Sequence, residues 1–181
     1  MNKLVMLAAF AISMVAAQVQ AQQVRNSQDV IRGAFARSGT TNQRAFDDST
    51  LVSLCNQGYT YVVYVYAGGR NGTVTCGGGR TLTYVNNTNW KDPSAIIRQA
   101  RSAIDKGGKV LIHCWNGIHA SKYVGAVALV EFCGFSGAQA KEFFVRGIRD
   151  GEISSRDSLA AKLGQLRNSG GGVISGCPSA R

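Results

Sequence analysis

The sequence of 181 residues lacks a hydrophobic run long enough to cross a membrane. Its longest apolar stretch, from Leu4 to Ala17, is shorter than the about 20 residues that a spanning helix needs. Lys3 precedes the stretch and Val19-Gln20-Ala21 ends it, which is the pattern of a signal peptide and its cleavage site. No cysteine follows that site to carry a lipid. We therefore expect residues 1–21 to be removed and the mature chain to be exported as a soluble periplasmic or secreted protein.

Acidic residues are also scarce. The chain has 10 Asp and Glu against 20 Lys and Arg, a formal net charge of +10 that becomes +9 once Lys3 is removed. This excess favours anionic partners in general. The basic residues are scattered, however, and no basic run is interleaved with aromatic residues. Nucleic acid is therefore not an expected partner.

Cysteine is limited to five residues, an odd number, and no Cys-x-x-Cys pair is present. In an oxidising compartment at least one cysteine is left without an intramolecular partner, and we expect this to be Cys114. The other four are expected to form two disulfides, in a pairing that the spacing leaves open among three connectivities. Those four candidates are Cys55, Cys76, Cys133 and Cys177.

The sequence shows no internal repeat and no second domain, and its strand and helix patterns indicate one α/β domain over residues 51–168, with a short central sheet flanked by helices. Residues 22–50 are predicted to form a loosely attached arm or a lead-in helix, and residues 169–181 a glycine-rich tail held only by Cys177. The expected strands are 59–66, 81–85 and 109–113, with a glycine-rich hairpin or loop over 71–79. The expected helices are 93–106, capped by Asp92, and 121–132, 135–149 and 156–167.

The most informative segment follows the apolar strand Lys109–Ile112. It reads His113-Cys114-Trp115-Asn116-Gly117-Ile118-His119-Ala120-Ser121 and leads directly into a helix. A strand that enters a tight loop and then a helix directs several backbone N–H groups inward, and the helix N-terminus adds partial positive charge. The segment therefore predicts an anion cradle, in which the N–H groups would also stabilise a nucleophilic thiolate at Cys114.

This segment resembles the signature loop of the cysteine-dependent protein tyrosine phosphatases, which reads His-Cys, five residues, Arg, then Ser or Thr. From residue 94 to about 150 the chain is similar to the dual-specificity branch of that superfamily. The resemblance implies a tyrosine-phosphatase-like fold with Cys114 as nucleophile, Ser121 as a hydrogen-bond donor to its sulfur and His113 as a support of the loop backbone. It also implies a phosphate-bearing ligand held by residues 115–120. No cofactor is expected, and a metal site at His113, Cys114 and His119 would lack a fourth ligand.

Two departures from the family pattern concern catalysis itself. Ala120 stands where the family has the Arg that grips two phosphate oxygens, and losing such a contact typically costs about 2.7–4 kcal/mol. Asn86 and Asn87 occupy the region of the family's general acid, and an amide cannot deliver a proton. The nearest carboxylate, Asp92, is better explained as the cap before Pro93.

The leading hypothesis is thus a pseudophosphatase that binds an anionic ligand or a protein partner. A first alternative is an active phosphatase on phosphoproteins or inositol phosphates, and a second is a thiol-redox protein acting through Cys114. The first alternative requires a basic substitute for the loop Arg, and the sequence offers five candidates: His119, Lys122, Arg70, Arg80 and Arg149. Trp115 is expected either at the pocket rim or against the next helix, and Tyr61, Tyr64 and Tyr66 are expected to serve strand packing.

Overall fold

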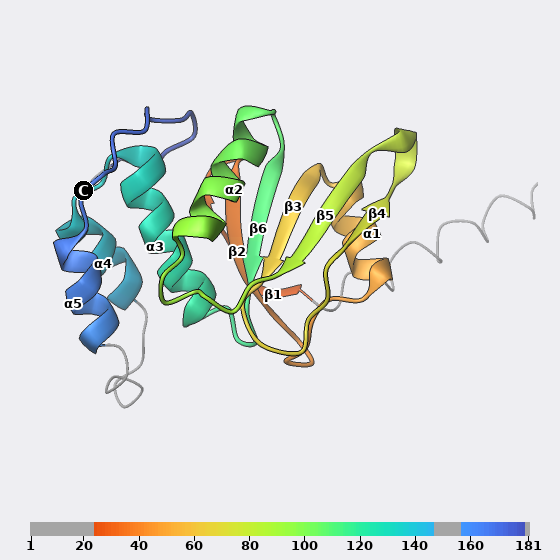
Figure 1. Ribbon diagram of the computed structural model, residues 1–181, viewed down its shortest axis with the longest axis horizontal. Helices are drawn as coiled ribbons and strands as arrows, with labels where there is room; N and C mark the ends of the chain where they lie inside the picture. Colours follow the sequence, from red (N-terminus) through yellow and green to blue (C-terminus); the bar gives the residue numbers. More distant parts are fainter. Residues whose placement is uncertain (1–23, 147–156, 180–181) are drawn as a thin grey trace, which may run out of the picture.

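A mixed six-stranded sheet forms the centre of the computed structural model, which describes residues 24–146 and 157–179 (Figure 1). The strand order is β1-β2-β6-β3-β5-β4. The four middle strands run parallel, and β1 and β4 pair antiparallel at the two edges. The strands are β1 (Val24–Ile31), β2 (Phe35–Thr40), β3 (Tyr59–Tyr64), β4 (Gly72–Thr75), β5 (Thr81–Asn86) and β6 (Lys109–His113).

Helices cover both faces of this sheet, as expected for an α/β fold (Figure 1). Because side chains alternate along a strand, Val63 of β3 joins a core beneath α2 and α3, whereas Val62 and Tyr64 join a second core beneath α1. The first core is mainly aliphatic, and α3 is buried on nearly every side. The helices are α1 (Asp48–Asn56), α2 (Ser94–Asp105), α3 (Ala120–Cys133), α4 (Gly137–Val145) and α5 (Asp157–Gln165).

The expected arm or lead-in helix over residues 22–50 is wrong. Residues 24–40 form the hairpin of β1 and β2, and β2 lies inside the sheet, paired in parallel with β6. Ile31 and Phe35 are almost completely buried. The apolar residues that suggested a short amphipathic helix lie in a strand pair instead, because β2 pairs with β6, about 75 residues further along the chain. Such non-local contacts override local propensity. The predicted signal peptide lies outside the described residues.

The start of α2 also differs from expectation, since Asp92 does not cap it. Pro93 occupies the cap position without a side-chain bond, and the helix begins at Ser94. Asp92 Oδ1 instead accepts a hydrogen bond from Ser94 Oγ at 2.7 Å. A further helix, α1, was not anticipated, although Asp47 caps it by accepting from Thr50 N at 2.8 Å.

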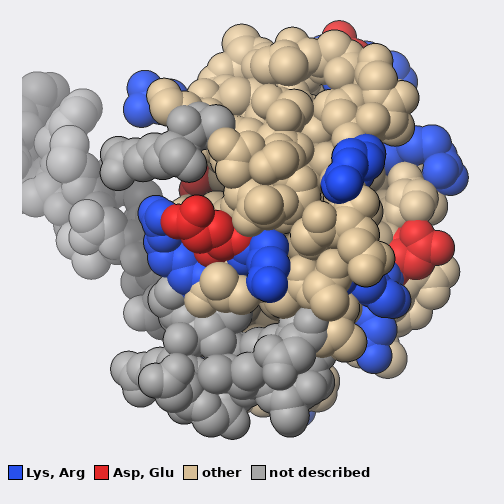
Figure 2. All heavy atoms as spheres, turned by 90° about the vertical axis from the view of Figure 1, so that its left-hand side faces the viewer, with Lys and Arg blue, Asp and Glu red and all other residues tan. Residues whose placement is uncertain are grey.

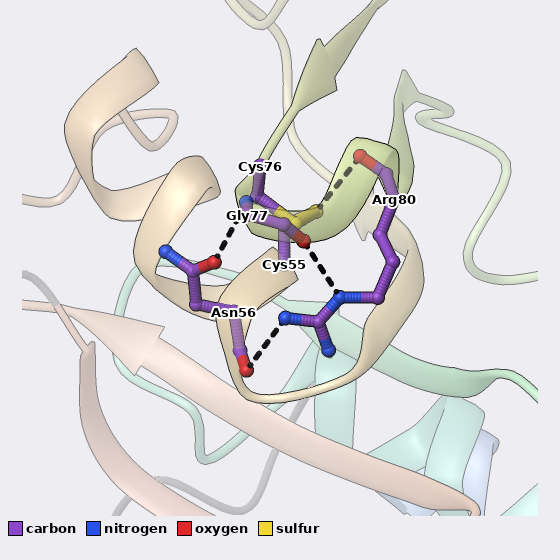
Figure 3. The surroundings of a disulfide bond; sticks show 5 residues. All are labelled: Cys55, Asn56, Cys76, Gly77 and Arg80. Carbon is purple, nitrogen blue, oxygen red and sulfur yellow. Dashed lines mark hydrogen bonds between the residues drawn. A yellow bond between two sulfur atoms is a disulfide. The ribbon is translucent and has the colours of Figure 1, made fainter.

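Two disulfides fix the pairing that the sequence left open. Cys55–Cys76 joins the end of α1 to the segment after β4, and Cys133–Cys177 ties the C-terminal tail to the end of α3. Around the first, Asn56 Oδ1 accepts a hydrogen bond from Gly77 N at 3.1 Å (Figure 3). Cys114 is the free cysteine.

The tail is not held by its disulfide alone, which corrects a second expectation. Ile174 N donates to Phe132 O at 2.9 Å, and the Arg101 guanidinium donates to Gly172 O at 2.8 Å. Gly176 O accepts from Arg32 N at 3.0 Å, which connects the tail to the turn of the β1–β2 hairpin. Within the described ranges, no helix combines the length and the apolar character that crossing a membrane requires.

Candidate active-site loop

The loop between β6 and α3 lies where the carboxyl ends of the parallel strands meet, the edge at which α/β sheets bind ligands. The last residue of β6, His113, is in register with Ser38 of β2 on one side and Tyr64 of β3 on the other. The loop that follows is therefore flanked by two strands. Its far end becomes the N-terminus of α3, a 14-residue helix whose dipole places partial positive charge at the loop.

Inside the loop the structure brings Cys114 and Ser121 together. Cys114 Sγ lies 3.3 Å from Ser121 Oγ and accepts a hydrogen bond from Gly117 N at 3.3 Å. Both side chains are buried, Cys114 being 1% exposed. Gly117 has a φ of 72°, and a Cβ built there would lie 2.6 Å from Gly39 N. This position therefore requires glycine both for its left-handed backbone and for the close approach of β2.

The β1–β2 hairpin binds the outer side of the loop through one acceptor and several donors. Cys114 N donates to Ser38 O at 3.2 Å, and Thr40 N donates to Trp115 O at 2.9 Å. Asn26 Nδ2 donates to Asn116 O at 2.8 Å. The guanidinium groups of two hairpin arginines also reach the loop, Arg25 at Asn116 Oδ1 and Arg37 at Gly117 O.

Arg37 is the residue of this set with the most direct electrostatic link to the cysteine. Its Nε and Nη2 donate to Gln28 Oε1 at 3.1 and 2.6 Å. Burial lowers the pKa of Arg37, and the negative charge of the Cys114 thiolate opposes that shift. Sequence reasoning missed Arg37, because in the sequence it is one of many scattered basic residues.

His113 lies beneath the loop in an aromatic compartment. Its ring stacks on Phe46 at 3.8 Å and on Tyr64 at 4.8 Å between centroids, and its Nε2 lies 2.8 Å from the Tyr84 hydroxyl. Burial lowers the pKa of His113 well below 6.5, so the ring is neutral at pH 7. Burial also raises the pKa of Tyr84. Among the described residues, His113 Nδ1 has no hydrogen-bond partner.

No family model and no curated protein matches this chain. Solved structures do. Tk-PTP in its active form is 20% identical, with a TM-score of 0.52 over 76% of this chain and 95% of that one. Human DUSP28 is 17% identical, with a TM-score of 0.51 over 76% and 91%. A mouse putative dual specificity phosphatase complexed with zinc tungstate is 15% identical, with a TM-score of 0.53 over 82% and 91%.

The chain has the fold of the dual-specificity tyrosine phosphatases. This confirms the resemblance and the fold class inferred from the sequence. Within the phosphatase fold, Ala120 is the first residue of α3 and is completely buried in the aliphatic core. Its methyl group offers no donor to an anion in the loop.

The basic substitutes considered from the sequence lie elsewhere or have other contacts. Arg70 forms an ion pair with Asp48, the first residue of α1. Arg80 precedes β5, at the end of the sheet opposite the loop, and its guanidinium donates to Gly77 O and Asn56 O (Figure 3). Lys122 Nζ donates to Arg146 O. His119 stands directly before α3, and Arg149 lies outside the described residues.

Asn86, which stands in the region where the resemblance implies a general acid, has a structural task. Asn86 Nδ2 donates to Tyr64 O at 3.0 Å and to Tyr66 O at 2.6 Å, and its Oδ1 accepts from Gly69 N at 3.2 Å. A carboxylate could not make the first two bonds. Asn87 Oδ1 accepts from the Asn89 backbone. The described residues also hold no group of three or more His, Cys, Asp and Glu side chains that could bind a metal ion.

Trp115 is partly exposed and contacts two tyrosines at the end of β3. Its side chain is 44% exposed, its Nε1 donates to the Tyr64 hydroxyl at 2.6 Å, and its ring meets the edge of Tyr66 at 5.0 Å. Tyr61 and Tyr64 are buried in the two cores beside β3. Burial, with the Cys114 charge as a smaller cause, raises the pKa of Tyr66 to about 12.

A surface hollow of about 580 Å³ lies beside the loop, between the hairpin, α3 and α4. Three of its lining residues are basic, and none of its lining residues is acidic. On the side shown in Figure 2, Lys and Arg form several separate groups, and Asp and Glu also lie on this face. The hollow is lined by Asn26, Ser27, Gln28, Arg37, Ile118, Lys122, Phe143 and Arg146.

Proposed function

We propose that this protein is a pseudophosphatase: it binds a phosphate-like anion, free or carried by a protein partner, in the Cys114 loop and does not hydrolyse phosphate esters at a useful rate. The observation that carries the proposal is the contrast inside one loop. The Gly117 N–H is still directed at Cys114 Sγ, 3.3 Å away, whereas the position of the phosphate clamp is a buried alanine.

Anion binding needs only the backbone N–H groups and the helix N-terminus that the loop retains. Backbone N–H groups at the N-terminus of a long helix attract oxyanions without any charged side chain. Hydrolysis needs more, because charge grows on the phosphoryl oxygens in the transition state and the leaving group must be protonated. Loss of one oxyanion contact costs roughly 10²–10³ in rate, and loss of general-acid catalysis roughly 10²–10⁴. With Ala120 and Asn86 in place, both losses apply to this chain.

The test compares binding with turnover on one preparation. The full sequence is expressed so that both disulfides form, and tungstate and inorganic phosphate are titrated into the protein by calorimetry. We expect both anions to bind to the protein and to its Cys114→Ser variant, because the cradle is made of backbone. We expect no phosphate release from a generic aryl phosphate by either. Absence of anion binding in both proteins would overturn the proposal.

A second candidate function is slow cysteine-dependent hydrolysis of phosphoproteins or inositol phosphates. The observation in its favour is Arg37, whose guanidinium donates to Gly117 O in the loop that holds Cys114. Turnover that disappears in Cys114→Ser would establish this candidate instead. The thiol-redox alternative has less support, because the Cys114 side chain is 1% exposed.

We also propose that the protein works outside the cytoplasm, in the periplasm or after secretion. Disulfides persist in such compartments, and two are formed here. Intact-mass measurement of the protein from a periplasmic or secreted fraction would test both points. The expected mass is that of a chain that starts at Gln22 and has lost four thiol hydrogens to its two disulfides. A full-length, fully reduced chain recovered from the cytoplasm alone would contradict the proposal.

A further inference from the structure

Three successive carbonyl groups of the Cys114 loop are all bound by the same hairpin. Trp115 O accepts from Thr40 N of β2, and Asn116 O accepts from Asn26 Nδ2 of β1. Gly117 O accepts from Arg37 Nη1 of β2. Consecutive carbonyl groups in a loop have no general reason to point the same way. Here each is fixed by a separate donor, and two of these donors are side chains.

The direction of these carbonyl groups determines the direction of the N–H groups that follow them. No peptide bond in the described chain is cis, and in a trans peptide the C=O and the next N–H point to opposite sides. The N–H groups of residues 117 and 118 therefore leave their peptides on the side opposite the Asn26 and Arg37 side chains. The Gly117 N–H reaches Cys114 Sγ at 3.3 Å. One loop N–H also lies near a hairpin carbonyl, because Gly39 and Asn116 form an isolated antiparallel bridge. Successive N–H groups aimed at one point form an anion-binding nest.

We propose that Asn26 and Arg37 are positioning residues of the anion site: by holding the carbonyl oxygens of Asn116 and Gly117 outward, they turn the Gly117 and Ile118 N–H groups toward the bound oxyanion. The proposal rests on the proposed function and adds the device that holds the cradle open without the loop Arg. Neither side chain touches the anion. Each acts through one peptide group, and the two residues come from β1 and β2 of the same hairpin.

The surroundings of Arg37 suit this task. Its guanidinium is fixed by two bonds to Gln28 Oε1, at 3.1 and 2.6 Å, which leaves Nη1 directed at Gly117 O. Its side chain also passes α3 where that helix has Gly125, and a Cβ there would lie 3.9 Å from Arg37 Cδ. Asn26 has a φ of 49°, a left-handed conformation that asparagine tolerates well.

The experiment measures tungstate affinity by calorimetry in four variants of the full chain. Asn26→Gly removes the Asn116 clamp without changing net charge and keeps the left-handed backbone accessible; we expect affinity to fall roughly three- to tenfold. Arg37→Gln should weaken binding roughly ten- to a hundredfold, because a charged donor is lost. Arg37→Lys keeps the charge but lacks the fork, and should restore only part of the affinity. The matched control is Arg32→Gln, which removes one exposed charge from the same hairpin and should leave affinity unchanged.

A second readout separates positioning from general structural damage. In the anion-free proteins, hydrogen exchange of the Gly117 and Ile118 amides should quicken in Asn26→Gly and Arg37→Gln, while exchange in β3 and α3 and the unfolding midpoint stay close to those of Arg32→Gln. Unchanged tungstate affinity and unchanged exchange in Asn26→Gly would overturn the inference even if Arg37→Gln fails to fold. If the unmodified protein binds no anion, the proposed function fails, whereas the exchange comparison still decides whether the hairpin sets the loop.

Discussion

The two sides of the Cys114 loop differ in which parts of the phosphatase-like loop pattern they keep. On the hairpin side, Asn26 and Arg37 donate to the carbonyl oxygens of Asn116 and Gly117, and the Gly117 N–H reaches Cys114 Sγ, the arrangement that we propose forms an anion cradle. On the opposite side, where the phosphatase fold carries its clamp and its acid, Ala120 is part of the core and Asn86 is committed to backbone carbonyls. In the proposed function, binding an anion and hydrolysing a phosphate ester thus depend on different residues, so that binding can persist where hydrolysis is lost.

The largest effect is expected where the hairpin and the loop touch. A Cβ on Gly39 would lie 2.4 Å from Asn116 C and 2.5 Å from Gly117 N, and both are backbone atoms that cannot rotate away. Gly39→Ala should lower the free energy of unfolding by about 3 kcal/mol and abolish tungstate binding. Urea denaturation and calorimetry check this. Gly172→Ala, at a site with open space around the Cβ position, is the matched control. Equal stability of the two variants would show that the hairpin and the loop are not in close backbone contact at Gly39.

Asn86→Asp tests the opposite side. It removes the donors to Tyr64 O and Tyr66 O and places a carboxylate against two carbonyl oxygens, so the free energy of unfolding should fall by about 2 kcal/mol. No aryl-phosphate turnover should appear. Asn87→Asp is the control: its Oδ1 accepts from Asn89 N, a bond that a carboxylate keeps, and its stability should change little. Turnover gained by Asn86→Asp would restore this position as a general acid.

A smaller effect should come from acidification. The pKa of His113 is depressed by burial, so the unfolded chain, near 6.5, takes up a proton before the folded chain does. The stability associated with neutral His113 is therefore complete above pH 6.5 and is lost as the pH falls, by up to about 1.4 kcal/mol per pH unit. His113→Gln should flatten the slope of unfolding free energy between about pH 6.5 and 5. His119→Gln replaces the chain's other histidine and should keep that slope; an equally steep slope in His113→Gln would refute the assignment.

The smallest effect is expected for Arg70→Gln. The Arg70–Asp48 pair is 45% and 74% exposed at its two side chains, and such pairs contribute about 0–1 kcal/mol. Stability should drop by less than about 0.5 kcal/mol, and tungstate affinity should not change. Thermal unfolding and calorimetry are sufficient to check both. A tenfold loss of tungstate affinity would show that Arg70 takes the place of the loop Arg in binding the anion. The two sides of the loop would then no longer differ in the way described above.

Short-range patterns predicted most of the elements correctly. The run of β-branched and aromatic residues after Tyr59 predicted β3, and the helix expected over residues 135–149 contains α4, which Ser136 caps by accepting from Gln139 N. The loop was placed correctly between β6 and α3 because strand, glycine and helix follow one another within a few residues. The hairpin of β1 and β2 was missed because its stability comes from a partner strand far along the chain.

The sequence by itself determined the chemistry that position 120 lacks, since an alanine has no donor in any environment. The odd number of cysteines also determined that at least one is left unpaired, whereas the structure decided that it is Cys114. The tertiary structure decided what holds the cradle: Asn26 lies 90 residues from Asn116, and Arg37 lies 80 from Gly117. It also decided that Asn86 is fully engaged by backbone groups. Hydrogen bonds between residues so far apart depend on strand pairing, which periodicity within a single segment does not encode.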